Sequence, residues 1–369
     1  MLDSWHFPRP ELARSTLVAL TQGPAQAITL MAPRRSGKTA FLLNDLAPHA
    51  EGQGHRLIYA SFWEGSAAPL AVLLHDLEGA RRQPNLADRQ GRILTGIRPR
   101  IGPVSPMAPP AGIEASRAVS PAPEDLLKLL DDGLGELARG RKPAILLLDG
   151  MEALARDPAH AGLLAALRKG IESRPQGLRA VFTLSSPAGH RALFGTRRAP
   201  FHRFATALDL PLLGEPFVDH GLQTVRQVSN RRLDRGPLLA AFRTLHGSPY
   251  LFRALLESLV LNPSLPVAEA LLRLRRDAAR RLGYPQLWTD LSPLQRAALR
   301  LLADGEASPF AVDSRARLGA LLDELAPTAA RVQAALRKLE RLGLATSLDR
   351  SWVLEDPALG DWVRDVAAP

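Results

Sequence analysis

The stretch that decides the fold is AITLMAPRRSGKTAFLL, residues 27–43. Its first five residues form a short apolar run, which is typical of a buried strand. A loop from Ala32 to Lys38 follows, and a helix is expected through residues 39–43. A strand, a loop and a helix in this order point backbone N–H groups at one place, where a phosphate can bind. The stretch therefore predicts a phosphate-binding loop.

The loop matches the pattern GxxxxGK[ST], with Ala32 in place of the first glycine. In this pattern Lys38 neutralises the β- and γ-phosphates, and the Thr39 hydroxyl ligates Mg²⁺. The residues expected to bind the nucleotide are Pro33, Arg34, Arg35, Ser36, Gly37, Lys38, Thr39 and Ala40. Ala32 adds only a methyl group, so we expect the loop to tolerate it, with strain only if that position needs a positive φ.

A second strand carries an acidic residue at its end. Residues 144–148 are apolar on both faces, as expected of a central parallel strand, and Asp149 follows directly. Ligands bind at this edge of open α/β sheets, so Asp149 is predicted to hold Mg²⁺. Gly150 stands where many P-loop ATPases place a water-activating glutamate. Glu152 is the nearest carboxylate and the candidate base, the alternative being a solvated side chain at a helix start.

The rest of the N-terminal half alternates strands with helices, which predicts a parallel sheet. Further strands are expected at 56–61, 178–184 and 205–210, and helices at 68–80, 124–138 and 160–173. Residues 101–123 hold six prolines and are interpreted as a flexible insertion.

Beyond residue 214 the strand signal stops. Helices are expected at 216–229, 236–246, 249–261, 266–282, 293–303, 314–325 and 328–342. Ser292 is a candidate N-cap with Pro293 at the first helical position, and residues 344–354 alternate around a turn. Three helices followed by a hairpin is the order of a winged helix. The predicted domains are 1–213, a nucleotide-binding α/β domain; 214–290, a helical lid; and 291–369, a winged helix.

Composition excludes several classes of protein. The chain has 369 residues, a net charge of +10 and no cysteine, which excludes disulfide frameworks, thiolate zinc sites and cysteine nucleophiles. Its longest apolar stretches are shorter than the roughly 18 residues of a membrane span, and the N-terminus lacks the signal-peptide pattern. We expect a cytoplasmic protein that does not contact a membrane.

These motifs resemble a known group. The segments PRRSGKT, LLLDGMEAL, VFTLSS and HGSPYLF, with the terminal winged helix, resemble the STAND group of AAA+-related P-loop ATPases and in particular the archaeal-type ATPase family. LLLDGMEAL is also similar to the NACHT pattern, although Ala153 replaces its second acid. The resemblance covers roughly residues 15–365, and it implies ATP or ADP as ligand with Mg²⁺.

The resemblance also implies further site residues. Ser185 and Ser186, at the end of the fourth strand, stand where a polar sensor contacts the γ-phosphate; the alternative for both is strand-end capping. Gly247 and Pro249 match the element of the lid that covers the nucleotide, the alternative being an ordinary helix break. Arg203 matches a segment whose arginine acts on a neighbouring subunit, which implies nucleotide-dependent homo-oligomers; Arg197 and Arg198 are the alternatives.

Basic residues indicate where DNA would bind. The excess of positive charge is concentrated in residues 197–291, and the helix at 273–281 carries five arginines. The expected helix at 329–342 carries Arg337, Lys338 and Arg341 on a polar face, and such a helix enters the major groove in winged helices. A solvated helix face is the alternative in both places.

Three hypotheses follow. The first is an ATP-binding switch with slow hydrolysis, whose winged helix acts on a protein partner. The second is a DNA-associated ATPase of the origin-loading or transposition-regulator type. The third is a nucleotide-stabilised scaffold without turnover.

Overall fold

The computed structural model describes residues 4–62, 68–82, 86, 123–348 and 351–366. Its centre is a five-stranded parallel sheet with the order β2-β3-β4-β1-β5. The strands are β1 (Ala27–Met31), β2 (Leu57–Ser61), β3 (Ala144–Asp149), β4 (Leu178–Leu184) and β5 (Ala205–Asp209). β3 is buried along its whole length, as expected of an interior parallel strand with a near-continuous apolar sequence.

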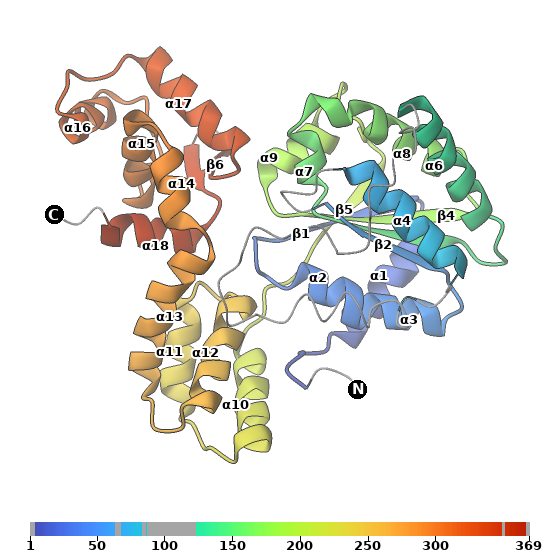
Figure 1. Cartoon of the computed structure of the whole chain (residues 1–369), viewed down its shortest axis with the longest axis horizontal. Coiled ribbons are helices and arrows are strands. Elements are labelled where there is room, and N and C mark those ends of the chain that lie inside the picture. The colour runs from blue at the N-terminus through green and yellow to red at the C-terminus, as the bar shows by residue number, and fades with distance from the viewer. Residues whose placement is uncertain (1–3, 63–67, 83–85, 87–122, 349–350, 367–369) are drawn as a thin grey trace, which may run out of the picture.

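Helices cover both faces of the sheet (Figure 1). One face is covered by α4 (Pro69–Arg82), α6 (Pro123–Leu137) and α8 (Ala161–Glu172), which pack against Leu146, Leu148 and Phe182. The other face is covered by α1 (Pro10–Gln22), α2 (Lys38–Phe41), the π-helix η1 (Leu42–Leu46) and α3 (Ala47–Gly52), which pack against Ile145, Leu147 and Val181. Alternate residues of one strand thus pack into the two separate cores on opposite faces of the sheet, because successive side chains of a strand point to opposite faces. We name this three-layered part the sheet body.

Short helices connect the strands at the edge of the sheet that carries the phosphate loop. They are α7 (Glu152–Ala155), the 3-10 turn η2 (Pro158–His160), α9 (Pro187–His190) and the π-helix η3 (Arg191–Gly195).

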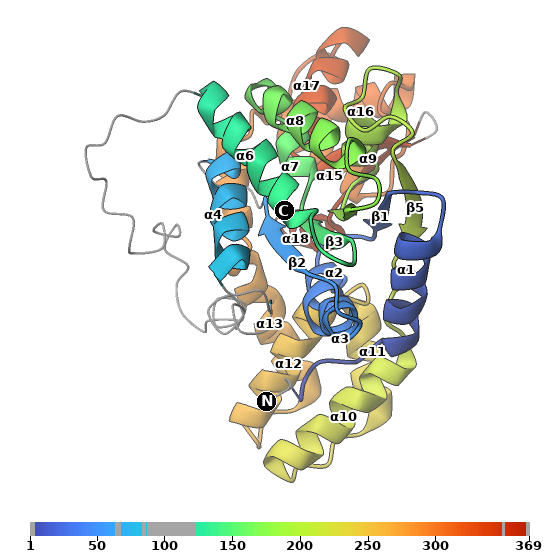
Figure 2. The same ribbon diagram turned by 90° about the vertical axis from the view of Figure 1, so that its right-hand side faces the viewer.

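Two further groups of helices follow the sheet body, each with a core of its own. The helical body consists of α10 (Glu215–Ser229), α11 (Arg235–Thr244), α12 (Pro249–Leu261) and α13 (Val267–Arg281). The C-terminal module consists of α14 (Tyr284–Asp290), α15 (Pro293–Ala303), α16 (Val312–Leu322), α17 (Ala329–Arg341), the antiparallel strands β6 (Ala345–Leu348) and β7 (Ser351–Leu354), and α18 (Pro357–Val366). Figure 2, turned by 90° from Figure 1, shows the helical body below the sheet body and α16 and α17 above.

Most expected elements are confirmed. The strands at 27–31 and 178–184 and the helices at 249–261 and 293–303 have the predicted bounds. The predicted helix at 314–325 begins and ends earlier, at Val312–Leu322, and the helix predicted from residue 160 starts with a 3-10 turn. The sequence analysis missed α1, α14 and α18. The Pro-rich segment 101–122 lies outside the described residues.

No helix in the described ranges is long and apolar enough to cross a bilayer.

Candidate functional site

The phosphate loop joins β1 to α2 at the carboxyl edge of the sheet. Gly37 has a φ of 92° and Arg35 a φ of 62°, so the turn uses the left-handed region twice, once at a glycine and once at an arginine. Ala32 is not among the residues with positive φ, so its methyl group carries no backbone strain. Its N–H donates to the Leu184 carbonyl (3.3 Å), which ties the start of the loop to β4.

Lys38 is buried inside this loop, with 7% of its surface exposed. Its ammonium donates to the carbonyls of Ala32 (2.7 Å) and Pro33 (2.8 Å). Burial lowers the pKa of Lys38 to about 8, although the charges of Glu152 and Asp149 favour the protonated form. The amine therefore lies where the loop and the acidic strand end meet.

Thr39 and Asp149 are in contact, 110 residues apart in sequence. The Thr39 hydroxyl donates to Asp149 Oδ2 at 2.6 Å. Tyr59, on the neighbouring strand β2, donates to the same oxygen at 3.0 Å, and the Thr183 hydroxyl on β4 donates to Asp149 Oδ1. Hydroxyl groups from one helix and two flanking strands thus orient a carboxylate that is 2% exposed.

Glu152 begins α7 and lies beside the end of β4. The Ser185 backbone N–H donates to Glu152 Oε1 at 3.1 Å. The other oxygen, Oε2, is buried and has no hydrogen-bond partner among the described residues. Because an unpaired buried carboxylate oxygen is costly, its persistence here points to a partner such as a water or ligand group.

The serines after β4 have separate roles. Ser185 fixes Glu152 through its backbone, whereas the Ser186 hydroxyl accepts from the Gly189 N–H at 2.9 Å and caps α9. Ser186 is thus the N-cap of α9, directly after β4. Ser185 stands next to Glu152, and its side chain forms no hydrogen bond with the loop among the described residues.

The element HGSP between α11 and α12 reaches the loop. His246 and Gly247 have φ values of 53° and 65°, and Pro249 occupies the first turn of α12. The Ser248 hydroxyl donates to the Arg35 carbonyl at 3.4 Å and also accepts from the Leu251 N–H. The helical body therefore touches the phosphate loop at this element.

The arginines after β4 lie away from this cluster. Arg197, Arg198 and Arg203 are exposed on the connection from η3 to β5, and Arg203 has a φ of 56°. Arg168 holds this connection by donating to the carbonyls of Pro200 (3.0 Å) and His202 (3.2 Å). A groove of about 710 Å³ between α7, α8 and Pro200 is also separate from Lys38 and Asp149.

An N-terminal segment, residues 4–9, is a part of the site that the sequence analysis missed. We name it the N-terminal strap. Arg9 donates to the Gly37 carbonyl (3.1 Å), its backbone N–H donates to Asp45 Oδ1 (2.8 Å), and its guanidinium lies over the Phe41 ring. At its other end the strap packs against α10, where the rings of Phe7 and Phe217 meet edge to face.

The oxygens of Thr39 and Asp149 fit Mg²⁺, which prefers hydroxyl, carboxylate and water oxygens. The buried Ser36 hydroxyl has no hydrogen-bond partner among the described residues, which leaves one more polar group of the loop available to an anion. Tyr59 and Thr183 were also missed; the only sequence signal for them is a hydroxyl within an otherwise apolar strand.

Comparison with known proteins agrees with this geometry. No protein-family model and no curated protein matches the chain. Among solved structures, the Walker-type ATPase PABY2304 of Pyrococcus abyssi is 17% identical, with a TM-score of 0.65 over 99% of this chain and 96% of that one. The ORC2 protein of Aeropyrum pernix, solved as ADPNP-ADP complexes, is 17% identical, with a TM-score of 0.58 over 96% and 91% of the two chains. At this identity the likeness shows the fold, which is a parallel α/β sheet of the P-loop NTPase type followed by C-terminal helices.

Proposed function

We propose that this chain binds ATP with Mg²⁺ at the phosphate loop and acts as a molecular switch with slow hydrolysis. The observation that carries the proposal is the contact of Thr39 with Asp149, beside the buried ammonium of Lys38. A P-loop fold alone fixes no activity, so the proposal rests on these side chains. ADP would bind in the same place.

Each residue of the site has a role in this proposal. The loop residues from Pro33 to Ala40 would surround the phosphates, and Lys38 would exchange its two loop carbonyls for phosphate oxygens. Thr39 and Asp149 would hold Mg²⁺, which supplies neutralisation of phosphate charge when bound. Gly247 and Pro249 would position the helical body over the nucleotide.

Hydrolysis would use Glu152. Its free oxygen, Oε2, would accept a proton from a water whose oxygen attacks the γ-phosphorus, while the bond from that phosphorus to the bridging oxygen breaks and leaves ADP. Ser185 would hold the carboxylate in place through its N–H. Arg203 would act from a second copy of the chain in a nucleotide-dependent homo-oligomer, since it is exposed on the connection from η3 to β5.

Three domains would carry this switch: a nucleotide-binding domain at 1–213, a lid at 214–290 and a winged helix at 291–369. The order of α15, α16, α17 and the β6–β7 hairpin supports the winged-helix assignment. In a STAND-type mechanism, the state of the bound nucleotide would change the position of this winged helix. That change would alter how the winged helix binds a protein partner.

The test is equilibrium binding of a fluorescent ATP analogue with and without Mg²⁺, followed by steady-state hydrolysis. Lys38→Ala should abolish binding, whereas Lys128→Ala, an exposed lysine on α6, should leave it unchanged. Glu152→Gln should retain binding and lose at least about 100-fold in turnover. Absence of binding in the wild-type chain would reject the proposal, and equal turnover in wild type and Glu152→Gln would reject hydrolysis.

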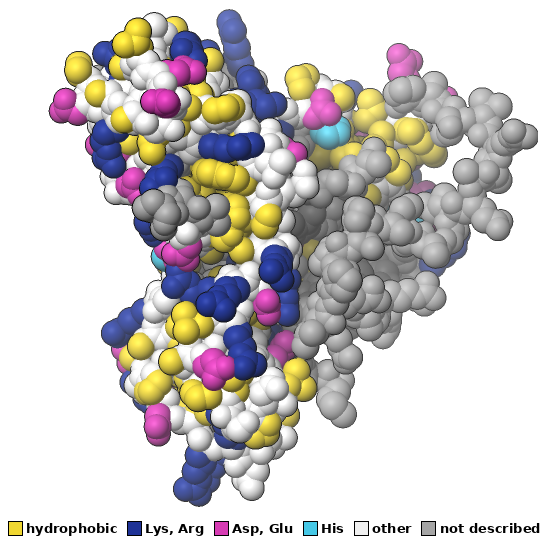
Figure 3. Space-filling model, turned by 60° about the vertical axis from the view of Figure 1, so that its left-hand side comes forward, with side chains coloured by type: hydrophobic (Ala, Val, Ile, Leu, Met, Phe, Trp, Pro, Cys, Tyr) yellow, Lys and Arg dark blue, Asp and Glu magenta, His cyan; other side chains and the backbone are white. Residues whose placement is uncertain are grey.

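A second candidate, DNA-associated ATPase activity, is supported by α17. Arg337, Lys338 and Arg341 are exposed there, and none forms an ion pair among the described residues. The α13 helix is weaker support, because Arg273 pairs with Glu269 and Arg275 with Asp365. Figure 3 likewise shows basic side chains interspersed with acidic and apolar ones on the face of the molecule that it presents.

DNA binding would be measured by fluorescence anisotropy over a series of salt concentrations. Replacing the three α17 residues by alanine should weaken binding and reduce the slope of log affinity against log salt by about 0.9 per lost phosphate contact. Identical slopes would remove α17 as the DNA-binding element.

A further inference from the structure

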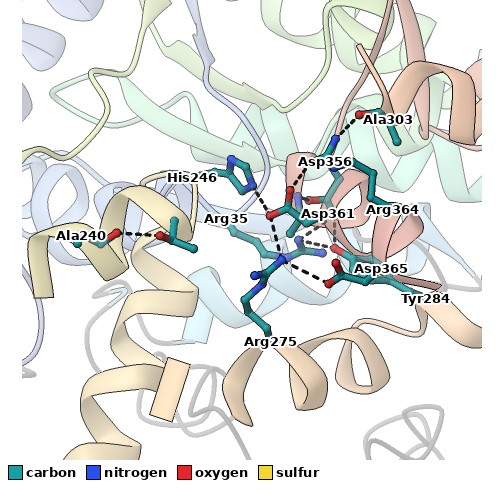
Figure 4. Close-up of polar contacts among 12 residues, drawn as sticks. Arg35, Ala240, His246, Arg275, Tyr284, Ala303, Asp356, Asp361, Arg364 and Asp365 are labelled. Carbon is teal, nitrogen blue, oxygen red and sulfur yellow. Dashed lines mark hydrogen bonds and ion pairs between the residues drawn. The ribbon is translucent and has the colours of Figure 1, made fainter. Parts of the chain in front are cut away.

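Two residues of the phosphate loop have a left-handed backbone conformation, and each is contacted from outside the loop. Arg35 binds Asp356 and Tyr284 of the C-terminal module, and Figure 4 shows these three side chains converging. Gly37 has no side chain, so a contact can hold it only through its backbone. Arg9 of the N-terminal strap does so, because its Nη2 donates to the Gly37 carbonyl at 3.1 Å.

Arg9 lies along one face of the helical stretch that follows the loop. Its contacts are Gly37, Phe41 and Asp45, which are spaced four residues apart, as neighbours on one helix face are. The guanidinium lies 5.1 Å from the centre of the Phe41 ring. The backbone N–H donates to Asp45 Oδ1 at 2.8 Å, and Nε lies 3.9 Å from Asp45 Oδ2. These contacts fix the arginine over the start of α2.

The ion pair of Arg9 with Asp45 is buried. The two side chains are 9% and 3% exposed, and His6 Nε2 lies 3.0 Å from Asp45 Oδ1. Burial lowers the pKa of Arg9 and the charge of Asp45 raises it, but a guanidinium keeps its proton in proteins. Nε and Nη1 of Arg9 form no hydrogen bond with any described residue. Unpaired buried donors cost free energy, so folding stability alone does not favour this arrangement.

The hydrogen bond from Arg9 fixes one peptide unit of the loop. The Gly37 carbonyl also accepts from the Phe41 N–H at 2.9 Å, so two donors hold the same oxygen. A trans peptide is planar, and its C=O and N–H point to opposite sides, so the Lys38 N–H points away from Arg9. Because Lys38 occupies the first position of α2, this N–H has no acceptor within the helix. It is therefore available to a phosphate.

Little else restrains the Gly37 peptide. Glycine populates positive and negative φ about equally, so the φ of 92° at Gly37 is not imposed by a side chain of its own. No side chain caps α2, and the neighbouring Ser36 hydroxyl forms no hydrogen bond with a described residue. Beyond its chain neighbours, a β-carbon at Gly37 would meet only Arg9 among the described residues, 3.5 Å from Nη2. Arg9 is thus the side chain that holds this peptide.

We propose that Arg9 is a positioning residue for phosphate binding, which holds the peptide between Gly37 and Lys38 so that its N–H faces the phosphates of a bound nucleotide. The inference rests on the proposed function and assigns part of its phosphate affinity to the N-terminal strap. Because Arg9 acts through the loop, it affects every ligand that carries the phosphates, whatever base is attached. A residue that contacts the base would lack this property.

The binding test compares ADP with tripolyphosphate, which has phosphates but no base, in the full chain with Mg²⁺. Arg9→Met keeps a long side chain over Phe41 but removes the charge and the donor. Both Kd values, measured by calorimetry, should rise at least about tenfold and by the same factor, as for a lost hydrogen bond to a charged group. Arg14→Met on α1 is the matched control, since Arg14 is exposed and pairs only with Glu11 among the described residues.

The outcomes separate the roles that Arg9 could have. Loss of affinity for ADP alone would place Arg9 at the base and overturn the inference. Unchanged affinities in a folded Arg9→Met protein with a lower melting temperature would also overturn it, because Arg9 would then only stabilise the fold. Arg14→Met should leave both affinities at their wild-type values.

A measurement without ligand tests the loop directly. The chain has five lysines, so ¹⁵N-lysine labelling gives five backbone amide signals, and the one from Lys38 is identified by its loss in Lys38→Arg. In Arg9→Met this signal should move or broaden, while the other four stay in place. His6→Gln changes the strap beside Asp45 but not its contact with Gly37, so the Lys38 signal should stay as in the wild type.

Two results of this measurement would overturn the inference. One is an unmoved Lys38 signal in Arg9→Met, and the other is an equal movement in His6→Gln, which would assign the effect to the strap as a whole. If the wild type binds neither ADP nor tripolyphosphate, the proposed function fails. The Lys38 signal alone then decides whether Arg9 positions the peptide.

Discussion

At the scale of single residues, Arg35 is the most constrained position of the phosphate loop. A non-glycine residue at a φ of 62° costs of order 1–3 kcal/mol and persists only when its surroundings hold it. Asp356 and Tyr284 bind its side chain, and Ser248 donates to its carbonyl. The strained arginine is therefore held by contacts from both the helical body and the C-terminal module.

Gly189 gives a residue-scale prediction for hydrolysis. A β-carbon there would lie 2.5 Å from the Glu152 β-carbon and 3.1 Å from the Ser186 hydroxyl, so Gly189→Ala must displace the candidate base. A shift of about 1 Å in a catalytic group costs about 100-fold in rate. We expect turnover to fall by about that factor, with ATP-analogue binding unchanged within about twofold.

The control for this substitution is Gly236→Ala on α11, where a β-carbon meets nothing within 4 Å. It should leave turnover and binding as they are. Wild-type turnover in Gly189→Ala would mean that Glu152 is not the base or that α9 moves without consequence.

The residues of the site were predictable to the extent that a local motif encodes them. Lys38, Thr39 and Asp149 follow from a loop pattern and an acidic strand end, and the structure brings them together. Tyr59 and Thr183 became visible only when the strand order placed β2 and β4 on either side of β3. Glu355 and Asp356 had no signal, because their partners lie at the other end of the chain.

At the scale of elements, the capping box at α15 illustrates how local sequence fixes a helix start. The Ser292 hydroxyl accepts from the Gln295 N–H, and the Gln295 side chain accepts from the Ser292 N–H at 2.9 Å. Pro293 at the first position removes a donor that the helix cannot use. The predicted start of this helix is confirmed for this reason.

Ser292→Ala should lower the free energy of unfolding of the C-terminal module by about 1 kcal/mol, because one N–H of α15 loses its acceptor. Chemical denaturation followed by the fluorescence of Trp288 and Trp362, which pack edge to face, would report it. Ser308→Ala serves as the comparison, since its hydroxyl caps no helix among the described residues, and it should change the free energy by less than about 0.5 kcal/mol. Equal effects in the two variants would contradict the role of the cap.

The elements that were missed have a physical explanation. The α1 helix precedes the first strand, and its sequence mixes polar and apolar residues. Its buried side chains are covered by the π-helix η1 and by β4. The α14 helix is only seven residues long, and Tyr284 is buried in the core of the C-terminal module rather than in that of α13. Propensity over so short a segment is overridden by such tertiary contacts.

At the scale of the whole molecule, the buried carboxyl of Glu355 is expected to make docking of the C-terminal module on the phosphate loop depend on pH. Its pKa is raised to about 7 when it is buried among Arg34, Arg156, Ser186 and Glu152, against an ordinary value of 4.5 in solvent. The docked state thus holds the proton more tightly, so its stability is fully present below pH 4.5 and is lost as the pH rises through 7. We expect docking to weaken between pH 5.5 and pH 8.

The distance between spin labels on Gln176→Cys and Leu325→Cys, exposed positions on the sheet body and the C-terminal module of this cysteine-free chain, checks this expectation when measured at both pH values. In Glu355→Gln the contribution of this group disappears, so the difference between pH 5.5 and pH 8 should be smaller than in the wild type. A difference of equal size in the two proteins would assign the pH dependence to other groups.

The N-terminal strap has a mechanical consequence for the molecule. It extends from the Gly37 carbonyl to α10, where Thr224 donates to the Ser4 carbonyl at 3.2 Å, so the sheet body and the helical body are joined by the strap as well as by the covalent connection from β5 to α10. Two attachments restrict the relative rotation of these two bodies more than the covalent connection alone would. Loosening the strap is therefore expected to let the helical body move relative to the sheet body.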